Sequence, residues 1–446
     1  MNILLKNCIV VPMTAAAGER QWYTGSVGIS GNRIEFASED EAKAGEFVRR
    51  HTDARTIDCR DKVVMPGLVN THCHVAMTLQ RSSADDIALM EWLNDYIWPF
   101  EARQTAGDIE LGARLGVVEM LLGGVTSFVD MYWHEASVFE AVDALGMRAL
   151  LTASCMDTNM DACERDLALL LDKSAGHRRI RAGVSPHAAY TCSPETLRRA
   201  KRLCDRHGLP MTMHISETRD EQRMVAERYG KTPVALAEEL GLLDERMIAA
   251  HCIYMSDSDM ETFVRRGVAV AHNPSSNMKI SSGTAPVAKM HGMGIRCTIA
   301  TDGACSNNDL DMWEEMRNAS FLQKVATMNP LTMPAYDILK MATADGAAAI
   351  GYGGELGIIA EGALADVIVV DVMKPHIYPL HNVVANLVYC AKASDVETVI
   401  VDGEIVVENR RIDGVDIGSL CRCVHERAME LSNKKLFGGH CTEIRN

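Results

Sequence analysis

The middle of the chain alternates between short apolar runs and longer stretches in which apolar residues recur every three or four positions. The short runs have the length of strands, and the longer stretches have the period of amphipathic helices. Eight strand–helix units between residues 63 and 357 predict an α/β fold, a (β/α)8 or TIM barrel. The predicted strands are Val63–Asn70, Val125–Tyr132, Arg148–Met156, Arg181–His187, Pro210–Ser216, Met247–Ile253, Val268–Asn273 and Arg296–Asp302. The predicted helices include Ile109–Leu122, Pro194–His207, Thr232–Leu240 and Met312–Lys324.

Residues 1–62 and 358–418 show a different pattern, in which short apolar runs are separated by turn signals. One such signal is Ser30-Gly31-Asn32, and another is Asp402-Gly403, which lies between two apolar runs and is a strong hairpin signal. Neither tract is long enough to form a convincing sheet domain alone. We therefore expect both termini to combine in one small β-sandwich domain. Residues 419–446 are expected to form a helix over Ser419–Leu431 and a tail.

Composition describes an ordinary water-soluble protein with a sizeable core, with 47% hydrophobic and 24% charged residues. The net charge of −15 argues against a nucleic-acid or anionic-membrane partner, because such partners need a basic face. The charge does not identify a substrate. It also leaves the oligomeric state open, a homo-oligomer included.

The cysteines and the first residues bear on the compartment. Fourteen cysteines are scattered, many within apolar runs, which fits reduced buried thiols better than a disulfide framework. Lys6 and Asn7 interrupt the apolar start of the chain, which lacks a positive leading segment, so a strand is expected there instead of a signal peptide. No apolar run approaches the roughly 18 residues of a membrane span. We expect a cytoplasmic protein.

Histidines and carboxylates fall where the predicted barrel strands end, and barrel chemistry collects at those C-terminal ends. A doubly wound open sheet, the competing fold, would not place functional residues after strands 1, 4, 5, 6 and 8. The residues concerned are His72 and His74 on strand 1, His187 on strand 4, His214 with Glu217 on strand 5, His251 on strand 6 and Asp302 on strand 8.

Three imidazoles and one carboxylate suit a single divalent cation with a position left for water. His72 and His74 alone could be polar residues at a strand end, but alternation along a strand puts them on one face with Cys73 on the other. With the other strand ends, they predict a metal site. The assigned ligands are His72, His74, His214 and Asp302. Zinc is the expected cation, one per subunit, although iron or manganese suits the same ligands.

The same residues suggest hydrolytic displacement at a polarised sp² carbon. A bound cation lowers the pKa of water towards neutrality, and Asp302 is placed to accept the proton. Glu217 lies three residues beyond a ligand and is expected to act as general acid and base on the substrate. His251 is expected to hydrogen-bond the activated water and to stabilise developing charge.

These motifs resemble the amidohydrolase superfamily over nearly the whole chain. The shared motifs are His72-x-His74 after Pro66-Gly67, Ser185-Pro186-His187, His214-Ile215-Ser216-Glu217, Ala250-His251-Cys252 and Thr301-Asp302-Gly303. Two-metal members carry a lysine on strand 4, whereas this strand has none and ends in His187, which implies the mononuclear deaminase branch. Longer motifs resemble the 5′-methylthioadenosine/S-adenosylhomocysteine deaminases. These are Asn70–Met77, Ala84-Asp85-Asp86, Met90-Glu91-Trp92-Leu93, Ile97-Trp98-Pro99, His272–Lys279, Thr301–Ala304 and Ser306–Met312.

The resemblance implies a hydrolytic deaminase of adenosine-type nucleosides modified at the 5′ position. Water would attack C6 of the purine and release ammonia. Glu101 matches the carboxylate that holds the ribose hydroxyls, and His187 matches a substrate contact near ribose and base. Glu217 would also recognise the ring nitrogens, and Asp302 would face the reacting carbon. The implied partner is a small-molecule nucleoside such as 5′-methylthioadenosine, S-adenosylhomocysteine, adenosine or 5′-deoxyadenosine.

One departure bears on the 5′ substituent. Relatives that act on S-adenosylhomocysteine can carry an arginine directly after Leu-Thr at the end of strand 3, where this chain has Ala153. Arg165 is similar to a second such arginine and could meet the amino-acid carboxylate. With one cation missing, substrates without the homocysteine group are expected to be favoured.

Other readings stay open. An aminohydrolase or dechlorinase of a free triazine, guanine or pterin would use the same metal site, and a silent scaffold would keep only the barrel. Glu101 could be a solvated helix-start acid and Arg165 a surface residue. Trp92 and Trp98 could stack on the purine or belong to the core. The remaining readings are a structural hydrogen bond for His272, a capping role for Asp130, and a less favoured second metal site at Cys421, Cys423, His425, His440 and Cys441.

Overall fold

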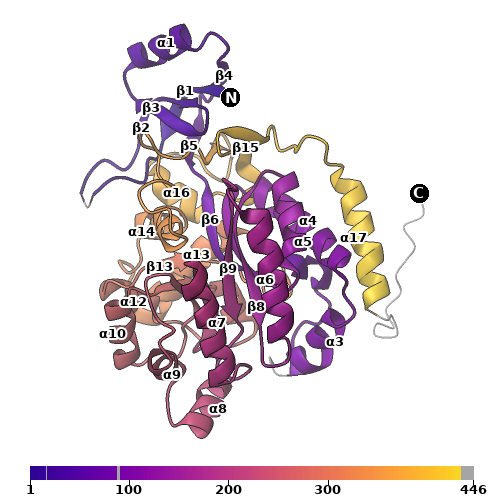
Figure 1. Cartoon of the computed structure of the whole chain (residues 1–446). Coiled ribbons are helices and arrows are strands. Elements are labelled where there is room, and N and C mark those ends of the chain that lie inside the picture. The colour runs from indigo at the N-terminus through magenta and orange to yellow at the C-terminus, as the bar shows by residue number, and fades with distance from the viewer. Residues whose placement is uncertain (17, 88–90, 433–446) are drawn as a thin grey trace.

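The computed structural model describes residues 1–16, 18–87 and 91–432, so Met90, His440 and Cys441 lie outside the described residues. Eight parallel strands follow one another around a nearly closed barrel in the order β6 to β13, with helices outside them (Figure 1). The predicted (β/α)8 barrel is therefore confirmed. Its strands are β6 (Leu68–Cys73), β7 (Val125–Tyr132), β8 (Arg148–Cys155), β9 (Ile180–Pro186), β10 (Met211–Ile215), β11 (Met247–His251), β12 (Ala269–His272) and β13 (Cys297–Ile299).

Hydrogen bonds between the first and last strands close the barrel. The hydroxyls of Thr71 and Thr298 lie 2.6 Å apart, and the side-chain amide of Asn70 donates to Oγ1 of Thr301 over 2.7 Å. Beyond them, the backbone N–H of Asp302 donates to the carbonyl of His72 over 3.1 Å. Closure therefore brings two predicted metal ligands side by side, although they lie at opposite ends of the barrel sequence.

The strand predicted over Val63–Asn70 is two strands. β5 (Lys62–Pro66) pairs with β14 (Val367–Asp371) in a second sheet, and β6 begins at Leu68 in the barrel. Gly67 separates them, and a Cβ there would lie 2.1 Å from Oγ1 of Thr126. The chain passes between the two sheets at a point where only glycine fits.

Both termini form the second sheet, as predicted, and its strands follow the order β16-β15-β14-β5-β1-β2-β3, with β4 paired to β1. β1 pairs with β2 on one side and with β4 and β5 on the other. Buried side chains from several of its strands form one apolar cluster, which includes Ile3, Val27, Val64 and Ile400. The remaining strands are β1 (Asn2–Val10), β2 (Tyr23–Ser30), β3 (Arg33–Ser38), β4 (Arg55–Asp58), β15 (Val396–Val401) and β16 (Glu404–Val407).

The predicted helices are present, and local signals set their ends. α7 runs over Pro194–His207 because Ser193 caps its N-terminus and Gly208, with a φ of 66°, ends it. The helices are α1 (Glu41–Arg50), α3 (Trp98–Glu101), α4 (Ala106–Leu122), α5 (Glu135–Ala144), α6 (Met160–Ser174), α7, α8 (Arg219–Tyr229), α9 (Pro233–Glu239), α10 (Asp257–Arg266), α11 (Pro274–Lys279), α12 (Val287–Gly292), α13 (Met312–Thr327), α14 (Ala335–Met341), α15 (Ala344–Ala349), α16 (Val383–Tyr389) and α17 (Ile417–Leu431). Two 3-10 helices, η1 (Val75–Gln80) and η3 (Ala393–Asp395), and one π-helix, η2 (Trp92–Ile97), complete the described helices.

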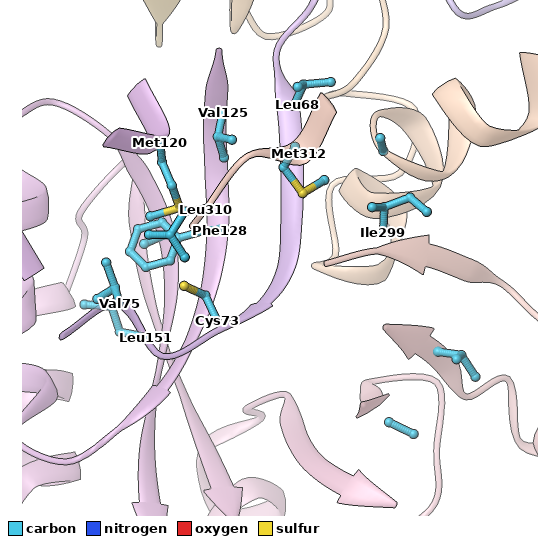
Figure 2. Packing of buried hydrophobic residues seen from close by; sticks show 14 of the residues in the cluster. Leu68, Cys73, Val75, Met120, Val125, Phe128, Leu151, Ile299, Leu310 and Met312 are labelled. Carbon is cyan, nitrogen blue, oxygen red and sulfur yellow. The ribbon is translucent and has the colours of Figure 1, made fainter. Parts of the chain in front are cut away.

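The outer core fixes the direction of the side chains at the end of β6. Cys73 packs with Val75, Phe128 and Leu310 in the layer between barrel and helices (Figure 2). It therefore points away from the histidines on either side, as strand alternation predicted. Among the described residues, no helix combines the length and apolar character that a membrane span needs.

Candidate metal centre and substrate cavity

Four histidines and one aspartate converge at the C-terminal end of the barrel. Nε2 of His72 lies 3.2 Å from Nε2 of His214 and 3.5 Å from Oδ1 of Asp302. Nε2 of His74 lies 3.1 Å from the same Oδ1. Donor atoms of His72, His214, His251 and Asp302 all lie within 4.8 Å of one another. The structure thus brings together every side chain that the sequence assigned to the metal.

Two ring orientations are set by backbone carbonyls. Nδ1 of His74 donates to the carbonyl of Met131 over 2.6 Å, and Nδ1 of His214 donates to the carbonyl of His187 over 3.0 Å. A carbonyl can only accept, so Nδ1 carries the hydrogen in both rings, and Nε2, which faces the cluster, is the atom that would bind a cation. Burial lowers the pKa of His72 to about 4 and that of His214 well below its usual value. His72 and His214 are therefore neutral, as metal ligands must be. At His74 the hydrogen bond to Asp302 outweighs burial and raises the pKa to about 9, so this ring would release a proton when a cation binds. The donor set fits a divalent cation.

Asp302 is held by two hydroxyls that sequence reasoning missed. Ser276 and Ser306 donate to its Oδ2 over 2.6 and 3.0 Å, which leaves Oδ1 facing the histidines. The backbone of Asp302 adopts a φ of 65° and that of His251 a φ of 70°. Left-handed backbone is unfavourable for these residues, and such strain clusters at functional sites. Both serines lie within motifs named in the sequence analysis, Ser276 on α11 and Ser306 in the loop after Asp302, but no local spacing shows that they meet Asp302.

His251 lies between Glu217 and Asp302. Its Nε2 is 4.0 Å from Oε1 of Glu217 and 4.0 Å from Oδ2 of Asp302. On the other side of the ring, Nδ1 pairs with Oδ1 of Asn277 over 2.8 Å. The amide of Asn277 therefore fixes the orientation of this histidine, another role that the sequence did not reveal.

Glu221, also missed, positions Glu217. Its carboxylate accepts the backbone N–H groups of Ser216 and Glu217 over 3.1 and 2.7 Å. It lies in the first turn of α8, where Thr218 is the N-cap and accepts the N–H of Glu221. The Thr-x-x-Glu pattern is a capping signal that could have identified this residue. Burial raises the pKa of Glu221 to about 8.

The cluster opens into a cavity with about 650 Å³ of empty space, and Glu101 lies on its wall. Tyr132 donates a hydrogen bond to Oε1 of Glu101 over 2.6 Å, and Gln80 donates to the Tyr132 hydroxyl over 3.3 Å. Burial raises the pKa of Glu101 to about 7. A carboxylate with a phenol partner therefore shares one cavity with the metal donors.

Other predicted residues also line this cavity. His187 packs edge-on against His214 with ring centroids 4.9 Å apart, and its Nδ1 lies 2.8 Å from Oγ1 of Thr191. Trp92 and Trp98 both contribute to the wall, so neither is simply a core residue. A second cavity, with about 1070 Å³ of empty space, adjoins at Glu101. It is lined by Trp98, Glu101, Ala102, Trp133, Met156, Thr158, Asn159 and Thr191.

Two expectations about the 5′ substituent do not agree with the structure. Arg165 is exposed on the outside of α6 and lines neither cavity, so the structure does not bring it to the site. Ala153 packs in the outer core, while the next residue, Ser154, lines the cavity. An arginine at position 153 would therefore start from the wrong face of β8, because neighbouring strand residues face opposite sides.

The remaining polar residues behave as follows. Asp130 accepts the backbone N–H of Val75 over 2.7 Å, which is the predicted capping role. His272 is buried, and neither ring nitrogen has a hydrogen-bond partner among the described residues, contrary to the structural hydrogen bond we expected. Cys421 and Cys423 are exposed on α17, and the described part of the chain shows no metal cluster there.

Comparisons with known proteins agree with this geometry. The amidohydrolase family matches residues 63–406. A 5-methylthioadenosine/S-adenosylhomocysteine deaminase from Desulfitobacterium hafniense is 42% identical over 96% of this chain and 98% of its own length. One from Thermococcus sibiricus is 41% identical over 91% of this chain and 94% of its own length.

Solved structures show the same architecture. An adenosine deaminase from Xanthomonas campestris with bound zinc has a TM-score of 0.92 and 31% identity, covering 96% of this chain and 98% of that one. An atrazine chlorohydrolase from Arthrobacter aurescens, at 22% identity, has a TM-score of 0.84 over 96% of this chain and 100% of that one, and it shows the fold alone. The chain belongs to the amidohydrolase family, in the group of the 5-methylthioadenosine/S-adenosylhomocysteine deaminases.

Proposed function

We propose that this protein is a metal-dependent hydrolytic deaminase of adenosine-type nucleosides modified at the 5′ position. It would convert the 6-amino purine of 5′-methylthioadenosine or S-adenosylhomocysteine to the inosine analogue and ammonia. Adenosine and 5′-deoxyadenosine are further substrates of the same class. The observation that carries the proposal is the shared cavity, which has the metal donors on one wall and the Glu101–Tyr132 pair on another. The names of its relatives support the same reaction.

His72, His74, His214 and Asp302 would hold one zinc ion per subunit, and the same donors would accept iron or manganese. A zinc ion there supplies Lewis acidity, which makes water acidic near neutral pH. The zinc-containing relative from Xanthomonas campestris supports the choice of metal.

The protein residues account for the proton movements. Asp302 takes a proton from the attacking water as its oxygen bonds to C6, and Glu217 protonates the ring nitrogen N1. C6 then becomes tetrahedral. Asp302 passes its proton to the amine, which leaves as ammonia, while the C6 hydroxyl returns a proton to Glu217 and becomes the carbonyl, and the proton on N1 stays in the product. His251 lies within 4.0 Å of both carboxylates and would hydrogen-bond the attacking water through Nε2.

Glu101 gives the cavity its nucleoside character. A carboxylate can accept hydrogen bonds from both hydroxyls of a ribose diol. His187 faces the same space and would contact the ribose and the base. A bare heterocycle has no use for this carboxylate, so the free triazine, guanine or pterin reading is disfavoured. A catalytically inactive scaffold would not need five metal-binding side chains that converge on one point, so this alternative is also disfavoured.

We further propose that the enzyme works in the cytoplasm on a small molecule, without nucleic acid or membrane as a partner. The described cysteines are free thiols, most of them buried, which fits a reducing compartment.

The decisive experiment measures ammonia release from nucleosides and free bases, with the metal content of the same preparation. The nucleoside panel is 5′-methylthioadenosine, S-adenosylhomocysteine, adenosine and 5′-deoxyadenosine, and the bases are adenine and guanine. We expect nucleosides to exceed adenine in kcat/KM by at least about a hundredfold, because the sugar contacts are lost with the base alone. Turnover confined to free bases would overturn the proposal.

A further inference from the structure

The segment that carries Glu101 is short and has two sides. α3 spans only Trp98–Glu101, a single turn. Trp98 and Glu101 line the substrate cavity, whereas Phe100 faces outward. α17 lies on that outer side, next to α4 (Figure 1). Whatever holds the outer side of α3 therefore also holds the carboxylate on its inner side.

Apolar contacts join α17 to this segment. Phe100 is buried in a cluster with Leu79 of η1 and with Val424, Ala428 and Leu431 of α17. The three α17 residues follow a spacing of four and three, so they form one stripe of the helix. This stripe covers the residue directly before Glu101.

An ion pair joins α17 to the chain just after Glu101. Arg427 donates to both carboxylate oxygens of Asp108, over 2.6 and 3.0 Å. Asp108 is buried and also accepts the backbone N–H and the hydroxyl of Thr105, both over 2.8 Å. This capping box begins α4, so it fixes where the chain leaves the Glu101 turn.

The described residues leave a space between these two contacts. A cavity that is open to solvent separates the α3 segment from α17. Tyr96, Pro99 and Arg103 line it on one side, and His425 and Met429 on the other. The segment has room to move outward there. Tyr132 holds it from the cavity side, and the contacts to Phe100 and Asp108 restrain it from the outer side.

We infer that α17 is a positioning element that holds the sugar-binding carboxylate of Glu101 in place, through Arg427 on Asp108 and the apolar stripe on Phe100. This inference rests on the proposed role of Glu101. Arg427 touches neither substrate nor metal donors, so its loss should weaken nucleoside binding and leave the chemical step intact.

The test compares Arg427→Met with Arg422→Met. Arg422 lies on the same helix and bonds only to the hydroxyl of Ser419 among the contacts of the described residues, so it is a matched control. We expect Arg427→Met to raise KM for 5′-methylthioadenosine about three- to tenfold, with kcat within about twofold of wild type. Arg427→Lys should restore part of the loss. The milder Val424→Ala, which shortens the stripe, should change KM in the same direction.

Amide hydrogen exchange of residues 91–105, without substrate, provides the second readout. Exchange there should accelerate in Arg427→Met and not in Arg422→Met, with zinc content unchanged. Unaltered exchange and KM in both Arg427→Met and Val424→Ala, or a loss confined to kcat, would overturn the inference. The sugar role of Glu101 is tested separately. If Glu101→Gln leaves KM for nucleosides unchanged, the proposed sugar role fails even where exchange confirms the mechanical coupling.

Discussion

The hydroxyl of Tyr132 donates a hydrogen bond to Oε1 of Glu101 over 2.6 Å, and this contact joins the end of barrel strand β7 to the α3 turn. It places a carboxylate acceptor where a ribose diol would lie if the purine faced the metal donors. The bond is charge-assisted when Glu101 is ionised, which makes it stronger than a neutral one.

Glu101→Gln should reduce kcat/KM for nucleosides by roughly a hundredfold, because hydrogen bonds to a charged acceptor contribute about 1.5–3 kcal/mol. Activity on adenine should stay within about threefold, since adenine has no diol. The measurement is steady-state ammonia release on both substrates. Glu110→Gln, on α4 and paired with Arg114, is the control. Equal losses on nucleoside and base would remove the sugar role.

The apparent affinity for nucleosides should depend on pH through Glu101. Its pKa is raised to about 7 by burial, so the carboxylate is protonated below that pH and accepts fewer hydrogen bonds. KM for 5′-methylthioadenosine should therefore fall by about tenfold from about pH 6 to about pH 8, whereas KM for adenine should not follow.

Tyr132→Phe extends this test, because the Tyr132 hydrogen bond lowers the pKa of Glu101. Its loss should move the fall in KM to higher pH. A profile that is identical in wild type and Tyr132→Phe would show that another group controls the titration.

Glu221→Gln should act on the chemical step. One of the two backbone N–H groups at Ser216 and Glu217 would lose its acceptor, and the Glu217 carboxyl would be less well placed to protonate N1. We expect kcat to fall by about tenfold with KM nearly unchanged. Glu227→Gln, exposed on the same helix, should leave both parameters unaltered. A change in KM alone would contradict this role.

Removal of the metal should abolish turnover and leave the fold intact. The ligands sit on barrel strands that are held by their own hydrogen bonds, including that from Asp302 N–H to the His72 carbonyl. Dialysis against a chelator should reduce activity to background, and about one equivalent of zinc per chain should restore it. Circular dichroism should remain native throughout. Full activity after verified metal loss would contradict the assignment of a catalytic metal.

The second cavity beside Glu101 predicts a preference among 5′ substituents. Among the described residues that line it, Glu101 is the only one with a formal charge. The carboxylate of S-adenosylhomocysteine would find no cation there. We therefore expect kcat/KM for 5′-methylthioadenosine to exceed kcat/KM for S-adenosylhomocysteine by about tenfold or more. Met156→Arg should reduce this difference in kcat/KM, because it adds a cation to the wall of the cavity. Equal turnover of both substrates by the unmodified enzyme would contradict the prediction.

Sequence reasoning succeeded where a local pattern coincided with a strand end. His72, His74, His214 and Asp302 each follow an apolar run, and barrel topology then requires them to meet. It failed at Gly67, because an apolar run continues through the residue at which the chain changes sheets.

It also failed where long-range packing decides a residue's role. Arg165 looked like a substrate contact by resemblance, but the face of α6 on which it lies points to solvent. Tyr132 at the end of β7 reaches Glu101 on α3, and Asn277 on α11 reaches His251 at the end of β11, and no local spacing encodes those contacts. Pairings of this kind require coordinates.

Strand β5 lies between β1 and β14, so the second sheet is assembled from the two extremes of the chain. During synthesis, β1 and β5 leave the ribosome long before β14 exists, and one edge of β5 stays unpaired until the whole barrel has emerged. An open edge of this kind is prone to pair with other chains. Completion of the native state therefore waits for a late, non-local pairing, and until then the open edge of β5 exposes the nascent chain to aggregation.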